Sequence, residues 1–252
     1  MSLIDLCQGY YKLENANAEI GNPFVDTGVT YQALKYNNGA FSANQNYHLT
    51  VANAVADMNA WAIGIWVKTN AWTIVNGHAS IEWQTFFIWY KNNSNRLYLY
   101  TGTPFTGWEG NIGGAGVGFY DKSGINISAS VPTYFLFIMN RAGIAGGSHT
   151  IRMYIGDSLL YSSTAAIPNI ADSTGAFRLL MFNYSSVVPF PFKGGQDECK
   201  IWKAEATTSQ ANIDAIIANR GVEGFPISNT FKRGPVNYIN NFPFNRPFAR
   251  VA

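Results

Sequence analysis

Large apolar residues occupy every second position in several segments of the chain. In segment 61–68 they are Trp61, Ile63, Ile65 and Val67, and in segment 150–155 they are Ile151, Met153 and Ile155. Successive side chains of a β-strand point to opposite faces, so this period of two is typical of a strand with one buried face. Both segments are therefore predicted to be half-buried strands.

Four further segments are rich in the aromatic and β-branched residues that strands favour. Segments 81–90 and 96–101 flank the turn-forming run Asn92-Asn93-Ser94-Asn95 and are predicted to form a hairpin. Segments 134–140 and 176–183 are apolar almost throughout, as expected of central strands covered on both faces. Together these patterns predict an all-β fold of stacked antiparallel sheets, a β-sandwich.

One segment is predicted to be a short helix. Hydroxyl residues that can cap a helix are followed by an apolar stripe and a glycine stop: Thr207, Thr208 and Ser209, then Ile213, Ile216 and Ile217, then Gly221.

The segment between Thr101 and Asn126 is rich in glycine and surrounds Trp108 and Glu109. Glycine permits irregular backbone conformations, so this segment is predicted to be an irregular surface loop. Loops on rigid scaffolds often carry binding sites, but a solvated connection without a ligand fits the same composition. Both interpretations remain open from the sequence.

The periodic pattern stops after Gly224, which divides the chain into a sandwich, residues 1–224, and an extended arm, residues 225–252. The arm is rich in Pro, Asn and Phe and forms neither a helical nor an alternating pattern. It is predicted to fasten the protein to neighbouring subunits of a larger assembly. Packing back on the parent sandwich is the alternative. The predicted anchors are Phe242, Phe244, Arg246, Phe248 and Arg250.

Charge is sparse and unevenly placed. Charged residues make up 13% of the chain and aromatic residues 15%, whereas charged residues usually make up about 25%. The formal net charge is +2, and the arm carries four basic residues and no acid. Nucleic-acid-binding domains more often carry a dense basic patch on the folded body, so no nucleic-acid partner is expected.

The sequence shows no membrane or export segment. No apolar run approaches the roughly 18 residues of a membrane-spanning helix. The start, Met1–Leu6, lacks the basic stretch and apolar run of a signal peptide. We therefore expect neither membrane insertion nor export by that route.

Four runs resemble, in chain order, the concanavalin A-like lectin/glucanase superfamily and its laminin-G-like domains: Tyr10–Glu14, Asp26–Gly28, Trp61–Lys68 and Gly195–Trp202. The resemblance extends over about residues 7–220 and implies a jelly roll of two antiparallel sheets with the opening strand near the closing one. Two positions depart from the usual closing run, where Gln196 replaces an apolar residue and Cys199 an aliphatic one.

The resemblance also implies a structural calcium ion, for which Asp26 and Asp197 occupy the appropriate places. The alternative is that Asp26 caps a turn and Asp197 accepts backbone hydrogen bonds. Family members include lectins, adhesion modules, glycanases and domains of phage particles, so the resemblance restricts the fold more than the function.

Catalytic patterns are missing from the sequence. Glycanases of this fold carry Glu-x-Asp-x-x-Glu on one strand, which this chain lacks. Asp197 and Glu198 are adjacent and are predicted to face opposite sides of a strand. His48, His78 and His149 lie in no recognisable motif. We therefore predict that the protein is not an enzyme.

Sugar recognition combines flat aromatic rings with amides and carboxylates that bond hydroxyl groups. Trp108, Glu109 and Asn111 are the predicted carbohydrate-binding group. The leading hypothesis is a structural or adhesion protein on the surface of a virion, a phage capsid or tail decoration, with cell-surface glycans as further partners. The alternative is a carbohydrate-binding module without an assembly role, cytoplasmic or extracellular, and the third hypothesis is a glycan-cleaving enzyme of altered motif.

Overall fold

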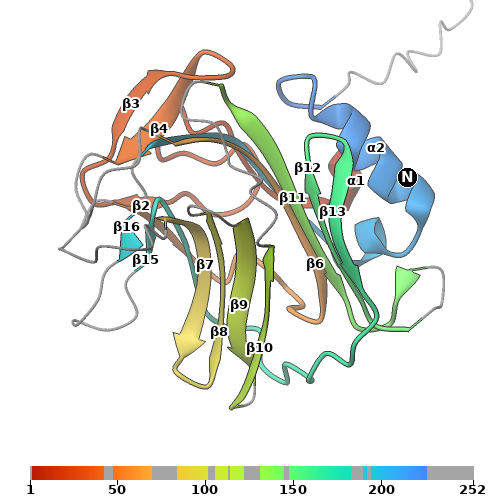
Figure 1. Cartoon of the computed structure of the whole chain (residues 1–252). Coiled ribbons are helices and arrows are strands. Elements are labelled where there is room, and N and C mark those ends of the chain that lie inside the picture. The colour runs from red at the N-terminus through yellow and green to blue at the C-terminus, as the bar shows by residue number, and fades with distance from the viewer. Residues whose placement is uncertain are drawn as a thin grey trace, which may run out of the picture.

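The protein folds as two antiparallel β-sheets packed face to face, as seen in a computed structural model (Figure 1). This confirms the predicted all-β sandwich. The structure describes residues 2–42, 48–69, 84–101, 106–112, 114–121, 131–144, 148–182, 190–191 and 194–225.

Sheet A is the larger of the two sheets. Its strands, in spatial order, are β13 (Ser158–Ser163), β12 (Thr150–Ile155), β11 (Thr133–Asn140), β6 (Ala60–Thr69), β17 (Gly194–Trp202), β4 (Asn38–Ser42) and β3 (Thr30–Ala33). The first strand, β1 (Cys7–Tyr11), pairs with β17, so the opening and closing strands lie side by side as expected. The strands β6, β11 and β12 contain the segments whose pattern predicted strands.

Sheet B consists, in spatial order, of β10 (Ala115–Asp121), β9 (Thr106–Ile112), β8 (Asn95–Thr101), β7 (Gln84–Asn92), β14 (Ala176–Leu179), β5 (Leu49–Ala52) and β2 (Val25–Asp26). A separate short pair is formed by β15 (Met181–Phe182) and β16 (Phe190–Pro191). The predicted hairpin around Asn93 and Ser94 is confirmed by the pairing of β7 with β8.

The prediction of an irregular loop over 101–126 is wrong for the part that the structure describes, because β9 and β10 form a hairpin there. Ladder hydrogen bonds use backbone groups, so glycine does not prevent pairing. Gly114 takes a φ of +87° at the turn, where glycine is needed. Gly116 lies within β10, and an added Cβ would meet nothing within 4 Å.

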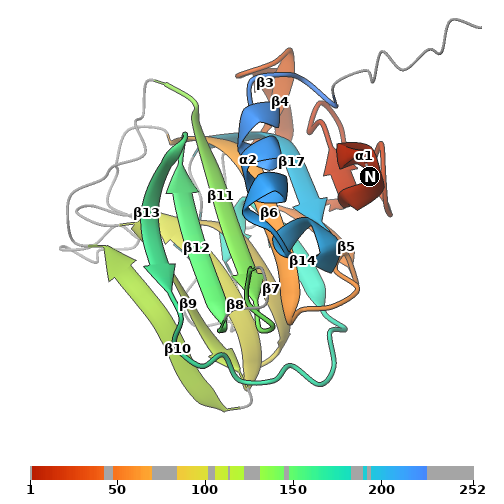
Figure 2. The ribbon, with the colours of Figure 1, turned by 90° about the vertical axis from the view of Figure 1, so that its right-hand side faces the viewer.

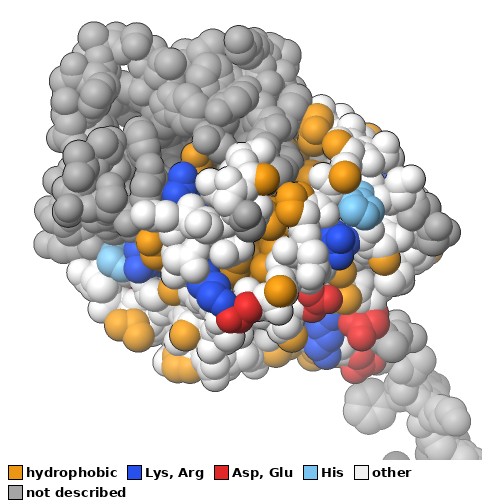
Figure 3. Space-filling view, turned by 90° about the horizontal axis from the view of Figure 1, so that it is seen from below, with side chains coloured by type: hydrophobic (Ala, Val, Ile, Leu, Met, Phe, Trp, Pro, Cys, Tyr) orange, Lys and Arg blue, Asp and Glu red, His pale blue; other side chains and the backbone are white. Residues whose placement is uncertain are grey.

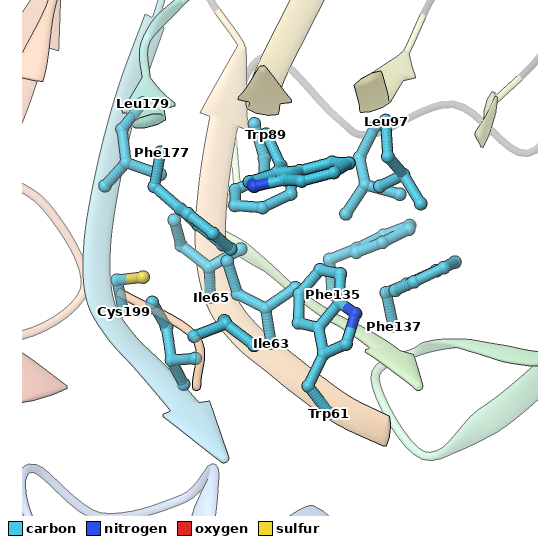
Figure 4. Close-up of a cluster of buried hydrophobic side chains, with 14 of the residues drawn as sticks. Trp61, Ile63, Ile65, Trp89, Leu97, Phe135, Phe137, Phe177, Leu179 and Cys199 are labelled. Atoms are coloured by element: carbon cyan, nitrogen blue, oxygen red, sulfur yellow. The ribbon is translucent and has the colours of Figure 1, made fainter. Parts of the chain in front are cut away.

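The core between the sheets is aromatic. Trp61 lies with its ring centroid 5.7 Å from that of Phe87, 5.6 Å from Phe137 and 5.8 Å from Phe177, and the side chains of both sheets point into a common interior (Figure 4). Trp89 is also fully buried there. The alternating apolar positions therefore form the interior, as the pattern predicts.

Three short helices lie on sheet A. α1 (Leu3–Leu6), the 3-10 helix η2 (Ala204–Thr207) and α2 (Gln210–Asn219) pack near β1, β6 and β11 (Figure 2). The predicted helix is confirmed as α2, whose N-cap Ser209 accepts a hydrogen bond from the Asn212 N–H at 3.2 Å. Helix α2 buries its apolar stripe in a second core on the outer face of sheet A.

Among the described residues, no helix is long and apolar enough to span a membrane. None of the described helices lies on the outer face of sheet B.

Candidate functional site

Polar and aromatic side chains meet on the outer face of sheet B. Trp89 and Leu97 of β7 and β8 point into the core, so alternation turns their neighbours outward. The pairing register then aligns outward positions across the sheet. We call these five residues the tyrosine–arginine shelf: Tyr90, Arg96, Tyr98, Asn111 and Arg178.

The pairing register fixes the order of the shelf. Tyr90 is opposite Arg96, and Arg96 is opposite Asn111, which places them in one row across β7, β8 and β9. Arg178 and Tyr98 are both register partners of Ile88 and form the next row. All five shelf residues are half-buried, whereas Ile88 is fully buried. The shelf residues are therefore partly accessible to solvent, whereas the adjacent Ile88 is shielded from it.

Contacts around the turn between β7 and β8 orient two shelf residues. The Arg96 Nη1 donates a hydrogen bond to the Asn93 carbonyl oxygen at 2.8 Å, and the Tyr90 hydroxyl donates to Asn93 Oδ1 at 3.3 Å. The Arg178 guanidinium lies 6.0 Å from the centroid of the Tyr90 ring, at the edge of cation–π range. The shelf is thus a set of polar groups held by the rigid sheet.

The side-chain oxygen of Asn111 is the shelf atom that points most clearly to a ligand. Its Oδ1 is buried, and no group in the described part of the chain donates a hydrogen bond to it. A buried acceptor without a donor costs roughly 1–3 kcal/mol. Gly116 pairs with Asn111 on the neighbouring strand and adds no side chain above it. A ligand hydroxyl is the kind of donor that would satisfy this oxygen.

The sequence-predicted group of Trp108, Glu109 and Asn111 is divided between the two faces of β9. Position 108 pairs with Leu99, a core residue, and therefore lies on the inner face. Positions 109 and 111 lie on the outer face, where position 109 pairs with Tyr98. Only Glu109 and Asn111 therefore fall on the face of the shelf.

Asp26 holds a turn at the end of β2. Its Oδ1 accepts hydrogen bonds from the Gly28 and Val29 N–H groups at 2.8 and 2.9 Å, and its Oδ2 accepts from the Tyr31 hydroxyl at 2.8 Å. Partial burial acts to raise the pKa of Asp26, but these hydrogen bonds hold it below its ordinary value.

Asp197 lies on β17 of the other sheet and is almost completely buried. Its Oδ2 accepts hydrogen bonds from the Lys35 and Tyr36 N–H groups at 3.1 and 2.8 Å. Burial raises the pKa of Asp197 to about 7, although the backbone hydrogen bonds oppose this.

The two predicted calcium ligands thus lie on strands of different sheets and accept hydrogen bonds from separate sets of donors. No group of three or more His, Cys, Asp or Glu side chains able to hold a metal occurs among the residues that the structure describes. Calcium prefers several oxygen ligands at once, and both of these carboxylates already accept hydrogen bonds from backbone N–H groups. Calcium binding stays a prediction from the resemblance.

Asp197 and Glu198 do not face opposite sides of β17 as predicted. The register shifts between Asp197 and Lys200, and Glu198 has a φ of +51°. Such a β-bulge inserts an extra residue and re-aims the side chains. Both carboxyl groups consequently lie on the outer side of sheet A, but they are 1% and 2% exposed and line no open cleft.

We predict that Asp197→Asn changes how stability depends on pH. The raised pKa means that the folded state holds this proton more tightly than the unfolded state. The resulting stabilisation is present below pH 3.8, the ordinary pKa, and is lost as the pH rises through about 7. From pH 5 to pH 8 the wild type should therefore lose about 3 kcal/mol of free energy of unfolding that the variant does not lose.

Urea denaturation at both pH values measures this difference, with Asp214→Asn, an exposed carboxylate on α2, as the control. A difference between Asp197→Asn and the wild type that is equal at pH 5 and 8 would contradict the prediction.

Several predicted residues lie outside the described residues. They are the arm residues Phe242, Phe244, Arg246, Phe248 and Arg250, together with His78. Their predicted roles stay predictions.

Comparisons with known proteins support the architecture. No family model matches the sequence, and no curated protein matches it. Among solved structures, the chain is similar to domain 4 of AbnA, a GH43 extracellular arabinanase from Geobacillus stearothermophilus, in complex with arabinotriose. The TM-score is 0.59 at 19% identity, over 79% of this chain and 92% of that domain.

The receptor-binding domain of botulinum neurotoxin type G is also similar, with a TM-score of 0.54 at 13% identity over 78% of this chain. A botulinum neurotoxin type C structure, whose cell entry depends on interaction with two ganglioside molecules, gives 0.59 at 12% identity over 85% of this chain. The matches span 47% and 51% of those two chains, so about half of each is compared. These similarities show a shared β-sandwich fold.

Proposed function

We propose that this protein is a non-catalytic carbohydrate-binding domain that binds a glycan on the tyrosine–arginine shelf. One observation carries the proposal: the register of sheet B gathers two half-buried tyrosines, two arginines and Asn111 on one face, and Asn111 Oδ1 has no donor among the described residues.

The chemistry of the shelf suits a sugar. The rings of Tyr90 and Tyr98 offer flat apolar surface for the C–H face of a pyranose or furanose. Arg96 and Arg178 supply N–H donors, and Asn111 Oδ1 supplies an acceptor. A sugar hydroxyl both donates and accepts, so one ligand satisfies both kinds of group.

The structural neighbours favour this proposal. Domain 4 of AbnA was solved with arabinotriose, and the type C toxin interacts with gangliosides. We extend glycan binding to this chain on the chemistry of its own shelf. Membership of the concanavalin A-like superfamily is proposed on the four sequence runs that resemble it.

The burial of the carboxyl groups of Asp197 and Glu198 favours a binding role without catalysis. Glycoside hydrolysis usually needs two carboxyl groups about 5 to 9.5 Å apart on either side of a bound substrate. Asp197 and Glu198 are buried and closed to a substrate.

The finer role of a virion surface protein is a second proposal, and it rests on the basic, Phe-rich composition of residues 225–252. Comparing the sedimentation of the full chain with that of a chain ending at Gly224 tests the arm. We expect self-association, or binding to isolated phage particles, only with the arm, and equal behaviour of both chains would count against it.

A glycan array tests the binding function. We expect the wild-type protein to retain a defined set of glycans and the Asn111→Ala variant to give a clearly weaker signal with the same glycans. Retention of no glycan by the wild type would refute the proposed function.

A further inference from the structure

A second concave surface lies at one end of the sandwich, beyond the ends of β5 and β14. Two connections form it: residues 53–59, which lead into β6, and residues 170–174, which lead into β14. They enclose an open cleft of about 560 Å³. Figure 3 looks onto this end of the molecule, where basic and acidic side chains lie interspersed and no large patch of one sign is seen among the coloured residues.

Hydrogen bonds between the two connections fix the walls of the cleft. The Asn59 side chain donates to the Ile170 carbonyl at 3.0 Å and accepts from the Ile170 N–H at 2.9 Å. The Met58 N–H donates to Ser173 Oγ at 2.8 Å. These bonds tie the two connections to each other, so the cleft is formed before any ligand binds.

Two further hydrogen bonds join Asn53 to Gly175 beside the same cleft. The Asn53 N–H donates to the Gly175 carbonyl at 2.8 Å, and the Gly175 N–H donates to Asn53 Oδ1 at 3.1 Å. The Asn53 amide nitrogen Nδ2 has no hydrogen-bond partner among the described residues, and Asn53 lines the cleft, so this N–H group is available as a donor there.

The two carboxylates that line the cleft differ in their hydrogen bonds and ion pairs. Asp172 Oδ1 accepts from Thr174, and its Oδ2 is paired with the Lys91 ammonium. Asp57 Oδ1 accepts two hydrogen bonds from Asn59, at 2.9 and 3.0 Å. Asp57 Oδ2 accepts none from the described residues, and no basic side chain there is paired with it. One carboxylate oxygen therefore remains available as an acceptor.

Apolar groups complete the lining. Val55 and Ile170 are each 2% exposed and belong to the main core, so they form a firm floor. The cleft thus combines an apolar floor, a free carboxylate oxygen and an amide donor, the combination by which proteins recognise compact polar ligands.

We propose that this end cleft is a second binding site, separate from the shelf, and that it takes one neutral sugar residue. Hydroxyl groups donate to Asp57 Oδ2 and accept from the Asn53 amide. The uncompensated charge of Asp57 disfavours acidic sugars, since like charges repel. A metal ion is disfavoured because the Lys91 ammonium is paired with Asp172, and because no group of three or more His, Cys, Asp or Glu side chains able to hold a metal occurs among the described residues.

The test is an NMR titration of the full-length, ¹⁵N-labelled protein. The probes are the methyl glycosides of arabinose, glucose, galactose, mannose and N-acetylglucosamine, each to about 20 mM, a range suited to weak single-residue binding, with N-acetylneuraminic acid as the acidic probe. We expect at least one neutral probe to shift the amide signals of residues 53–59 and 170–175. Asp57→Asn should weaken that binding about tenfold, since a hydrogen bond to a charged group is lost.

Asp214→Asn is the matched control and should bind like the wild type. Lack of shifts at the cleft with every neutral probe, equal shifts with the acidic probe, or an unchanged affinity of Asp57→Asn would overturn the proposal. Shifts at the cleft without shifts on β7, β8 and β9 would support this site while contradicting the shelf, and the reverse pattern would do the opposite, so the two proposals fail separately.

Discussion

Lys200→Met is expected to lower the free energy of unfolding by about 3–5 kcal/mol. The Lys200 ammonium lies 3.1 Å from Glu198 Oε2, and both side chains are nearly inaccessible, at 5% and 2% exposed. Removal of the lysine leaves the Glu198 charge buried without its partner, which is the costly case for an ion pair.

The surroundings of this pair explain why little relaxation is available. Lys200 Nζ also donates to Asn219 Oδ1 at 3.1 Å and to the Gly224 carbonyl at 2.6 Å. Glu198 accepts from the Tyr10 hydroxyl at 2.7 Å and from the Gly224 N–H at 3.1 Å. Burial lowers the pKa of Lys200, although Glu198 opposes this, and burial together with Glu198 raises the pKa of Tyr10.

The double variant Lys200→Met/Glu198→Gln separates the charge from the packing. Because it removes both charges, it should recover at least half of the lost stability. Denaturant unfolding with comparison of midpoints and m-values measures both. A single variant within about 1 kcal/mol of the wild type would show that the cluster contributes little to folding.

The second large effect concerns binding. For a glycan selected on the array, Tyr98→Ala and Asn111→Ala are each expected to raise the dissociation constant about tenfold, or about 1.4 kcal/mol. Tyr98 would lose ring contact with the sugar, and Asn111 would lose the acceptor of a hydroxyl hydrogen bond. Calorimetric titration gives both constants.

Stability distinguishes this explanation from simple damage to the fold. Asn111→Ala removes a buried acceptor that has no donor in the described part of the chain, so the free energy of unfolding should stay equal or rise. Tyr161→Ala, a half-buried tyrosine of β13 in sheet A, should destabilise the protein without changing affinity. Equal losses of affinity in Tyr161→Ala and Tyr98→Ala would contradict a site on the shelf.

Much of the fold can be predicted from the sequence, because whether a residue is buried depends strongly on its own side chain. The alternation in 61–68 predicted β6, and the uniformly apolar 134–140 predicted β11, whose two faces are covered by the core and by the helices. Helix α2 was predictable from Ser209, since an N-cap is a local interaction. The hairpin of β9 and β10 was missed because its glycines carry no side-chain signal for pairing.

The shelf was predictable only in part. Of its five residues, the sequence predicted only Asn111 as a binding residue, from an amide beside an aromatic residue and a carboxylate. Tyr90, Arg96, Tyr98 and Arg178 were not predicted. Strands β7, β8 and β9 follow one another in the chain, but β14, which carries Arg178, is about 80 residues away, and no local pattern encodes its pairing with β7. The bulge at Glu198 was likewise hidden, because a positive φ is usual for glycine and uncommon elsewhere.

The most direct test of the proposed function is a crystal structure of the protein with the glycan that it binds most tightly on the array. We predict a sugar ring against Tyr98 and a sugar hydroxyl donating a hydrogen bond to Asn111 Oδ1. A glycan held elsewhere on the molecule, with the tyrosine–arginine shelf untouched, would contradict this account.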